Sequence, residues 1–179
     1  MSDNSELLPL YLHLARACEL RRQAMERDKV LVLAGMTAAE MGLNTVAAAC
    51  RRRILAANTG HLVRRFSSFT HARGDEEFET YVKQLRRSYP RERVEHMLDS
   101  LGVERGNERA TYESDYEYAA ALLGATPDAL EAELRDDERA PGDDWPAAEE
   151  LHPTNWWLTG LLIALLAAII GVAIWLILD

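Results

Sequence analysis

The stretch DKVLVLAGMTAAEMGLNTVAAACRRRILAANTGH, residues 28–61, decides the fold class of this 179-residue chain. In its second half, apolar residues recur at helical spacing at Val46, Ala49, Cys50 and Ile54. Asn58-Thr59-Gly60 follows them as a helix stop. Ala, Leu, Arg and Glu dominate residues 6–135, and no segment there alternates β-branched residues with the period of two that a strand requires. We therefore predict an all-α domain, either a helical bundle or a short α-solenoid of helix pairs.

Three further apolar stripes with helical spacing flank this stretch. They are Leu7, Leu10, Leu14, Ala17 and Cys18; Phe78, Tyr81, Val82 and Leu85; and Tyr112, Tyr116, Ala119 and Leu123. Pro90 ends the second stripe, and Gly124 and Pro127 end the third. Cys18 and Cys50 lie inside such patterns, so we expect buried free thiols in a reducing compartment rather than a disulfide.

A faint repeat relates these helices. Gly42, Gly74 and Gly106 are each 32 residues apart, and each precedes a predicted helix. A helix pair that recurs at about this length is typical of an α-solenoid. Residues 28–61 resemble a tetratricopeptide repeat. The matching positions are Gly35 for the glycine of the first helix, Gly42 for the turn, Ala47 for the small residue of the second helix, and Asn58-Thr59 for the Asp-Pro pair.

The resemblance covers residues 28–100, because Gly74-Asp75-Glu76-Glu77-Phe78 and Tyr89-Pro90 are similar to the second half of another unit. The sequence departs from the family where Ile54 replaces an alanine and Thr59 replaces the proline, and its second unit is shorter. The resemblance implies a groove for peptides or partner helices, and it implies no catalytic residues.

Residues 156–178, WWLTGLLIALLAAIIGVAIWLIL, form a run of 23 positions without a charge. At about 1.5 Å per residue this run makes a helix of roughly 34 Å, and the hydrocarbon core of a bilayer is about 30 Å thick. Trp156 and Trp157 open the run and Trp175 lies near its other end, where indole rings favour the headgroup regions. We therefore predict one transmembrane helix, with the lipid bilayer as a partner.

One face of this predicted span carries small residues, which let membrane helices approach closely and favour a homodimer. They are Gly160, Ala164, Ala167 and Gly171. Only Asp179 follows the span, and the chain begins MSDNSELLPL without the basic start of a secretory signal. We therefore expect a tail-anchored arrangement, with the N-terminal domain in the cytoplasm.

The helical domain, residues 1–135, and the span are joined by an acidic segment. Residues 136–155 hold seven acidic residues, one arginine and three prolines, which predicts a flexible linker with a charge of −6. Such a linker would extend over roughly 25 Å r.m.s.. Residues 1–135 carry 19 basic and 21 acidic residues, so the domain itself is nearly neutral.

The sequence offers little for catalysis. Its five histidines do not pair at i+3 or i+4, and it has no HExxH, GxGxxG, Walker or GxSxG motif. We predict no enzymatic activity, no cofactor and no metal site. One alternative stays open, a membrane-tethered ferritin-like bundle with metal-dependent activity, because Glu92 and Glu95 precede His96. In YESDYEY, residues 112–118, the acids point around different helix faces, and we expect the tyrosines at a packing seam with their hydroxyls near solvent.

The basic residues are more informative, because 18 of the 20 are arginines and residues 51–93 carry eleven basic against five acidic groups. The candidate basic surface comprises Arg51, Arg52, Arg53, Arg64, Arg65, Arg86 and Arg87. It could bind phosphate, lipid headgroups, RNA or an acidic protein, or it could consist of solvated, salt-bridged faces. Successive helical residues diverge by about 100°, so three consecutive arginines cannot form one flat patch, which disfavours nucleic acid.

These features predict a tail-anchored, single-pass membrane protein. Its helical domain acts as an adaptor or scaffold that binds another protein at the membrane surface. A lipid or nucleic-acid binder that uses residues 51–93 stays an alternative.

Overall fold

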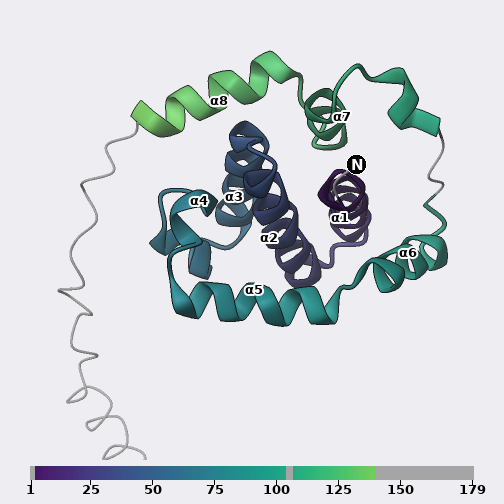
Figure 1. Cartoon of the computed structure of the whole chain (residues 1–179), viewed down its shortest axis with the longest axis horizontal. Coiled ribbons are helices and arrows are strands. Elements are labelled where there is room, and N and C mark those ends of the chain that lie inside the picture. The colour runs from purple at the N-terminus through teal and green to yellow at the C-terminus, as the bar shows by residue number, and fades with distance from the viewer. Residues whose placement is uncertain (1–2, 104–106, 140–179) are drawn as a thin grey trace, which may run out of the picture. The chain divides into compact units, whose positions relative to one another are not determined.

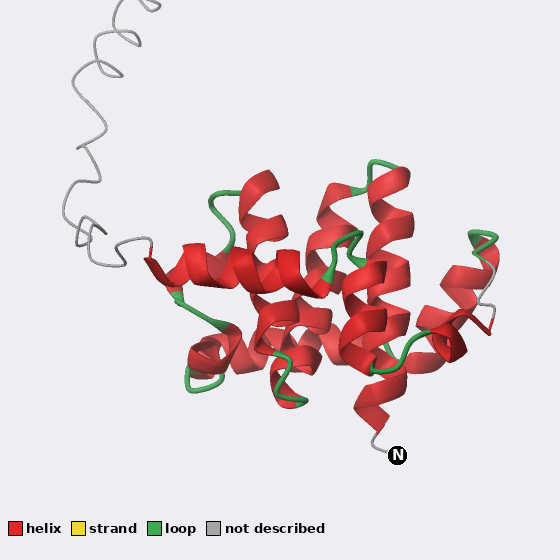
Figure 2. Ribbon diagram, turned by 90° about the horizontal axis from the view of Figure 1, so that it is seen from above, coloured by secondary structure: helices red, strands yellow, loops and turns green. Residues whose placement is uncertain are grey.

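A computed structural model describes residues 3–103 and 107–139, and in this part of the chain every regular element is a helix (Figures 1 and 2). The α-helices are α1 (Asp3–Leu20), α2 (Ala24–Glu40), α3 (Asn44–Ala57), α4 (Phe69–Ala72), α5 (Glu76–Ser88), α6 (Arg91–Ser100), α7 (Asp115–Leu122) and α8 (Pro127–Arg139). Two 3₁₀ helices, η1 (Leu62–Arg65) and η2 (Asn107–Thr111), lie between them. The all-α prediction is confirmed.

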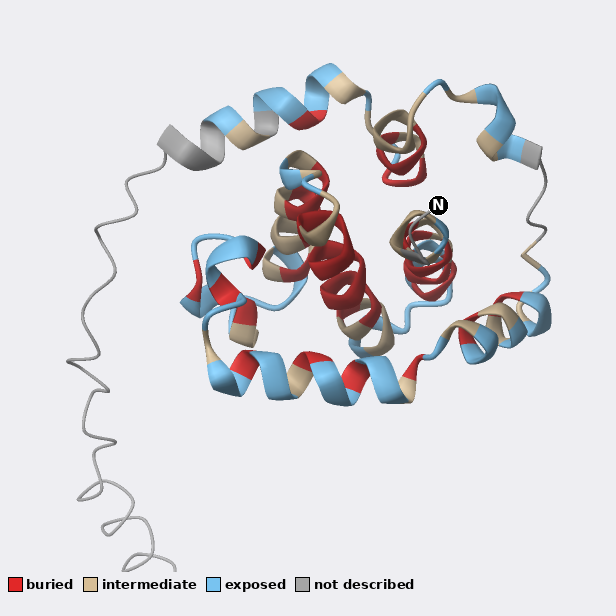
Figure 3. Cartoon of the chain, in the orientation of Figure 1, coloured by how far each residue is buried: buried red, intermediate tan, exposed pale blue. Residues whose placement is uncertain are grey.

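The helix α2 lies at the centre of this domain. Every residue from Val30 to Ala39 is buried, so α2 is covered on all sides (Figure 3). It packs against α1, α3, α4 and α5. The outer helices contact partners far away in sequence, because α1 packs against α6 and α7, and α3 packs against α7 and α8. This is the contact pattern of a bundle, whereas a solenoid unit contacts only its neighbours.

Gly35 explains how α4 closes onto the central helix. A Cβ atom added at Gly35 would lie 2.2 Å from the Phe69 ring of α4, so only a glycine allows this close approach. Phe69 in turn lies beside Phe78 of α5, with ring centroids 6.2 Å apart, and Phe66 lies 5.3 Å from Phe78. Gly35, the position that matches the first-helix glycine of a tetratricopeptide repeat, therefore contacts the Phe69 ring of α4.

Four helices end in the same left-handed turn, in which a backbone N–H reaches back to a carbonyl five residues earlier. These bonds are Gln23–Cys18, Leu43–Ala38, Val103–Leu98 and Ala125–Ala120, with N–O distances of 2.8–3.0 Å. The left-handed residue is Gly42, Gly102 or Gly124 in three of them, and Arg22, with a φ of 58°, in the turn between α1 and α2. For a non-glycine residue this conformation costs about 1 kcal/mol.

The predicted helix boundaries agree with the structure in the middle of the chain and differ near its ends. The helix α3 ends at Ala57, directly before the predicted stop, and α5 ends at Ser88, before Pro90. Tyr112 was placed in the last predicted helix but precedes α7. Cys18 and Cys50 are both buried and unpaired with each other, as predicted.

The C-terminal predictions concern mostly residues outside the described part. Residues 136–139 belong to α8, so the helical domain extends four residues into the predicted linker. The rest of that linker, the span 156–178 with its three tryptophans, and the small-residue face all lie beyond Arg139. Among residues 3–103 and 107–139, we find no helix with the length and apolarity needed to cross a bilayer. Within the described residues, the buried hydrophobic cluster runs from Leu8 to Leu130.

Candidate functional site

An open groove with a volume of about 740 Å³ lies between α1, α6 and α7. Pro9 and Leu10 of α1 supply its apolar surface. Its other lining residues are polar: Ser5, Glu6, His13, Arg91, Glu95, Arg109, Asp115 and Tyr118. We call this feature the α1–α6–α7 groove. Its chemistry is that of an apolar strip between charged walls.

Arg91, the first residue of α6, joins two walls of the groove. Its guanidinium forms an ion pair with Glu6 of α1, and its Nε lies 3.0 Å from a carboxylate oxygen of Glu95, one turn along α6. Hydrogen bonds to Glu95 and Glu6 raise the pKa of Arg91. Because about two fifths of the Arg91 side chain is exposed, these pairs are weak enough to exchange with a ligand.

Arg91 also lines a second cavity of about 590 Å³ on the other side of α1. Leu7 and Tyr11 of α1, Arg86 of α5 and Pro90 form part of its wall. Arg86 pairs there with Glu40 of α2, at a distance of 2.5 Å between nitrogen and oxygen. The first three turns of α1 are therefore bordered by a cavity on each side, and Arg91 lies between the two.

His13 and Tyr118 form a polar contact within the groove. The His13 Nε2 atom and the Tyr118 hydroxyl lie 2.9 Å apart and share a hydrogen bond between α1 and α7. Tyr118 is buried, and Tyr112 covers its ring at a centroid distance of 5.2 Å. Burial raises the pKa of Tyr118, so its hydroxyl stays protonated at neutral pH. The pair joins α7 to α1.

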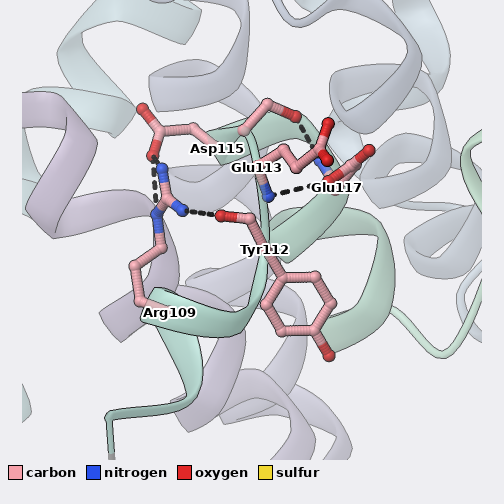
Figure 4. Close-up of polar contacts among 6 residues, drawn as sticks. Arg109, Tyr112, Glu113, Asp115 and Glu117 are labelled. Carbon is pink, nitrogen blue, oxygen red and sulfur yellow. Dashed lines mark hydrogen bonds and ion pairs between the residues drawn. The ribbon is translucent and has the colours of Figure 1, made fainter.

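Arg109 fixes the third wall of the groove (Figure 4). Its Nε and Nη2 atoms both donate to one carboxylate oxygen of Asp115, at 3.0 and 2.7 Å, and its Nη1 donates to the Tyr112 carbonyl at 2.8 Å. These bonds hold η2 against the first turn of α7. A guanidinium that bonds a carboxylate and a carbonyl together gives strong geometric specificity.

The prediction that the three acids of residues 112–118 point around different helix faces holds only for Asp115, because Glu113 precedes α7 and lies beside Glu117 (Figure 4). Asp115 pairs with Arg109, whereas Glu117 accepts a hydrogen bond from the Glu113 backbone N–H at 3.0 Å. Ser114 caps the same helix by accepting from the Glu117 N–H. The tyrosines pack at the seam, but their hydroxyls bond to protein groups, Tyr118 to His13 and Tyr116 to the Pro127 carbonyl.

The arginines of the candidate basic surface contact different parts of the domain. Arg51 donates to the Phe66 carbonyl at 2.9 Å, Arg53 to the Leu123 carbonyl, and Arg64 to the Thr59 carbonyl at 3.2 Å. Arg65 pairs with Glu77 at 2.5 Å and Arg86 with Glu40 at 2.5 Å. Arg52 is half-buried on α3, and Arg87 is exposed on α5. Most of these guanidiniums therefore bond to a carbonyl or pair with a carboxylate of the domain itself.

Sequence reasoning did not identify the groove. Its walls meet through pairs such as His13 with Tyr118 and Arg91 with Glu6, which are 105 and 85 residues apart. Spacing rules operate within one helix, so they carry no signal for such pairs.

Among the residues that the structure describes, no three His, Cys, Asp or Glu side chains are grouped so that they could hold a metal ion. Glu92, Glu95 and His96 are therefore not joined by ligands from a second described helix. No family model, no curated protein and no solved structure matches this chain.

Proposed function

We propose that this protein is a single-pass membrane protein whose helical domain binds a partner protein in the α1–α6–α7 groove. Residues 156–178 would anchor it, and the domain would act as an adaptor at the membrane surface. The groove is the observation that carries this proposal. Its volume of about 740 Å³ lies within the range of roughly 300–1,000 Å³ that ligand-binding sites occupy.

The shape of the groove favours a polypeptide segment over a small molecule. The groove is open, and Arg91 also lines the second, separate cavity on the other side of α1. Along α1 the groove extends from Ser5 to His13, which is more than two helix turns. An amphipathic helix suits this groove. Its apolar side chains can pack on Pro9 and Leu10, while its acidic side chains can replace Glu6 and Glu95 as partners of Arg91.

The anchor is tested by flotation of the full chain with lipid vesicles after alkaline washing. We expect the full chain to float and a variant that lacks residues 156–178 to stay at the bottom of the gradient, because these residues form the apolar run that is long enough to span a bilayer. Equal behaviour of the two chains would contradict the anchor.

The groove is tested by photocrosslinking in intact membranes. A benzophenone amino acid replaces Ser5, which lines the groove, and in a matched control it replaces Thr80, which is exposed on α5. We expect a partner adduct of defined mass from position 5 alone, and its loss when Arg91→Ala is added. Identical adducts from both positions would contradict a partner site in the groove.

A further inference from the structure

The turn between α1 and α2 exposes two large apolar side chains. Leu20 is 80% exposed and Met25 is 77% exposed, and no other large hydrophobic residue in the described part of the chain reaches this level. Isolated exposed apolar residues are ordinary, but these two flank the same turn. The residues between them are Arg21, Arg22, Gln23 and Ala24, all of which are exposed.

The turn is built differently from the three other helix ends of the same geometry. Those ends have glycine at the left-handed position, and the residue that follows it, Leu43, Val103 or Ala125, packs against the core. In the turn between α1 and α2, Arg22 takes the left-handed position and the following residue is the exposed Gln23. A non-glycine residue in the left-handed conformation is strained, and strain of this kind is typical of functional positions.

The side chains of this turn combine two chemistries. Arg21 and Arg22 present guanidiniums, and Arg21 also donates to the Leu101 carbonyl at the end of α6, at 3.3 Å. Leu20 and Met25 present apolar groups directly beside them. Guanidiniums bind phosphate and carboxylate headgroups, while adjacent apolar side chains enter the boundary with the acyl chains.

The size of the patch favours a bilayer over a protein. A stable protein interface takes about 20–30 residues on each partner, whereas this turn supplies the six residues 20–25. A weak contact is sufficient when the domain is already tethered, because tethering raises the effective concentration of the surface. Because α8 ends at Arg139, the predicted linker comprises the 16 residues 140–155, and a flexible chain of that length would span roughly 22 Å r.m.s. between the domain and the proposed anchor.

We propose that the turn of residues 20–25 docks the domain onto an anionic bilayer surface, with Leu20 and Met25 in the interface and Arg21 and Arg22 on lipid headgroups. This contact rests on the proposed anchor, since the tether supplies the proximity. It would orient the helical domain on the membrane, whereas the acidic linker alone would be repelled by anionic lipid.

The experiment uses the full chain reconstituted in vesicles of phosphatidylcholine with or without phosphatidylserine. An environment-sensitive dye is attached to Met25→Cys or, as the control, to Thr80→Cys on α5. Cys18 and Cys50 are buried, so the unsubstituted chain reports any background labelling. A nitroxide carried by the lipid quenches the dye only when the dye reaches the interface.

We expect quenching at position 25 and not at position 80, and stronger quenching with phosphatidylserine. Adding Arg21→Ala with Arg22→Gly should lower the docking equilibrium constant by about 30-fold, from the attraction of two basic side chains to an anionic surface. Glycine suits the left-handed position, so this variant keeps the fold. Equal quenching at both positions in chains that float would overturn the inference alone. Chains that do not float would overturn the anchor, and the inference with it.

Discussion

Replacement of Gly35 by alanine tests the close packing on which the domain is built. Gly35 lies inside α2, where alanine is ordinarily the better residue by about 1 kcal/mol. Here the added methyl carbon would lie 2.2 Å from Phe69 Cε2 and 2.7 Å from Cδ2 and Cζ. Contacts this short force either the Phe69 ring or the whole of α4 to move away from α2.

The expected effect is a net loss of stability. Overpacking a core costs about 1–3 kcal/mol, and the helix preference of alanine offsets about 1 kcal/mol. We therefore expect Gly35→Ala to lower the free energy of unfolding by up to about 2 kcal/mol. For a domain of this size, that corresponds to a fall in Tm of up to roughly 8 °C.

The assay is urea unfolding of the full chain in detergent, followed by far-UV circular dichroism. Phe69→Leu shortens the side chain that the new methyl group meets, so Gly35→Ala should cost much less in that background. A coupling energy of about 1 kcal/mol or more between the two substitutions is the expected result. Additive effects, or a more stable Gly35→Ala chain, would refute the reasoning.

Three further substitutions or measurements test other parts of the domain. Arg53→Gln removes a charged donor from the Leu123 carbonyl, so we expect a loss of about 1–2 kcal/mol and faster amide hydrogen exchange after α7; unchanged exchange would contradict this role. Burial raises the pKa of Cys50 to about 12, so its thiol should resist thiol reagents until unfolding, and stability should fall as the pH rises from about 9 towards 12. A hydrogen bond from Tyr89 lowers the pKa of Glu26, which favours the folded state above about pH 4.5 and is lost on acidification. Tyr89→Phe should therefore flatten the acid limb of the stability curve, and an unaltered limb would refute the contribution of this bond.

The sequence predicts those features that repeat within a single helix. The stripes at Val46 and Phe78 place α3 and α5 and their buried faces, because helical periodicity records which side faces a core. The left-handed turn at Gly42 is visible for a similar local reason. Arg22 carries no such signal, because arginine is not a residue from which a left-handed turn is inferred.

The groove and the roles of the arginines depend on which helices meet. Arg53 reaches a carbonyl 70 residues away, and a basic run alone cannot distinguish such a cap from a binding surface. The closure of α4 onto α2 depends on the pairing of Gly35 with Phe69, two residues with no regular spacing. Local patterns therefore predicted the helices and left their assembly open.

The central position of α2 also bears on the order in which the helices unfold when an unfoldase pulls on the C-terminal end of the domain. An unfoldase that grips the chain beyond α8 would first detach α8 and then α7, the outer helices that pack on α3 and α1. Their loss leaves α2 covered by α1, α3, α4 and α5. We therefore expect the greatest resistance to unfolding from the C-terminal end to come from α1–α5, after α7, which lines the groove, has detached.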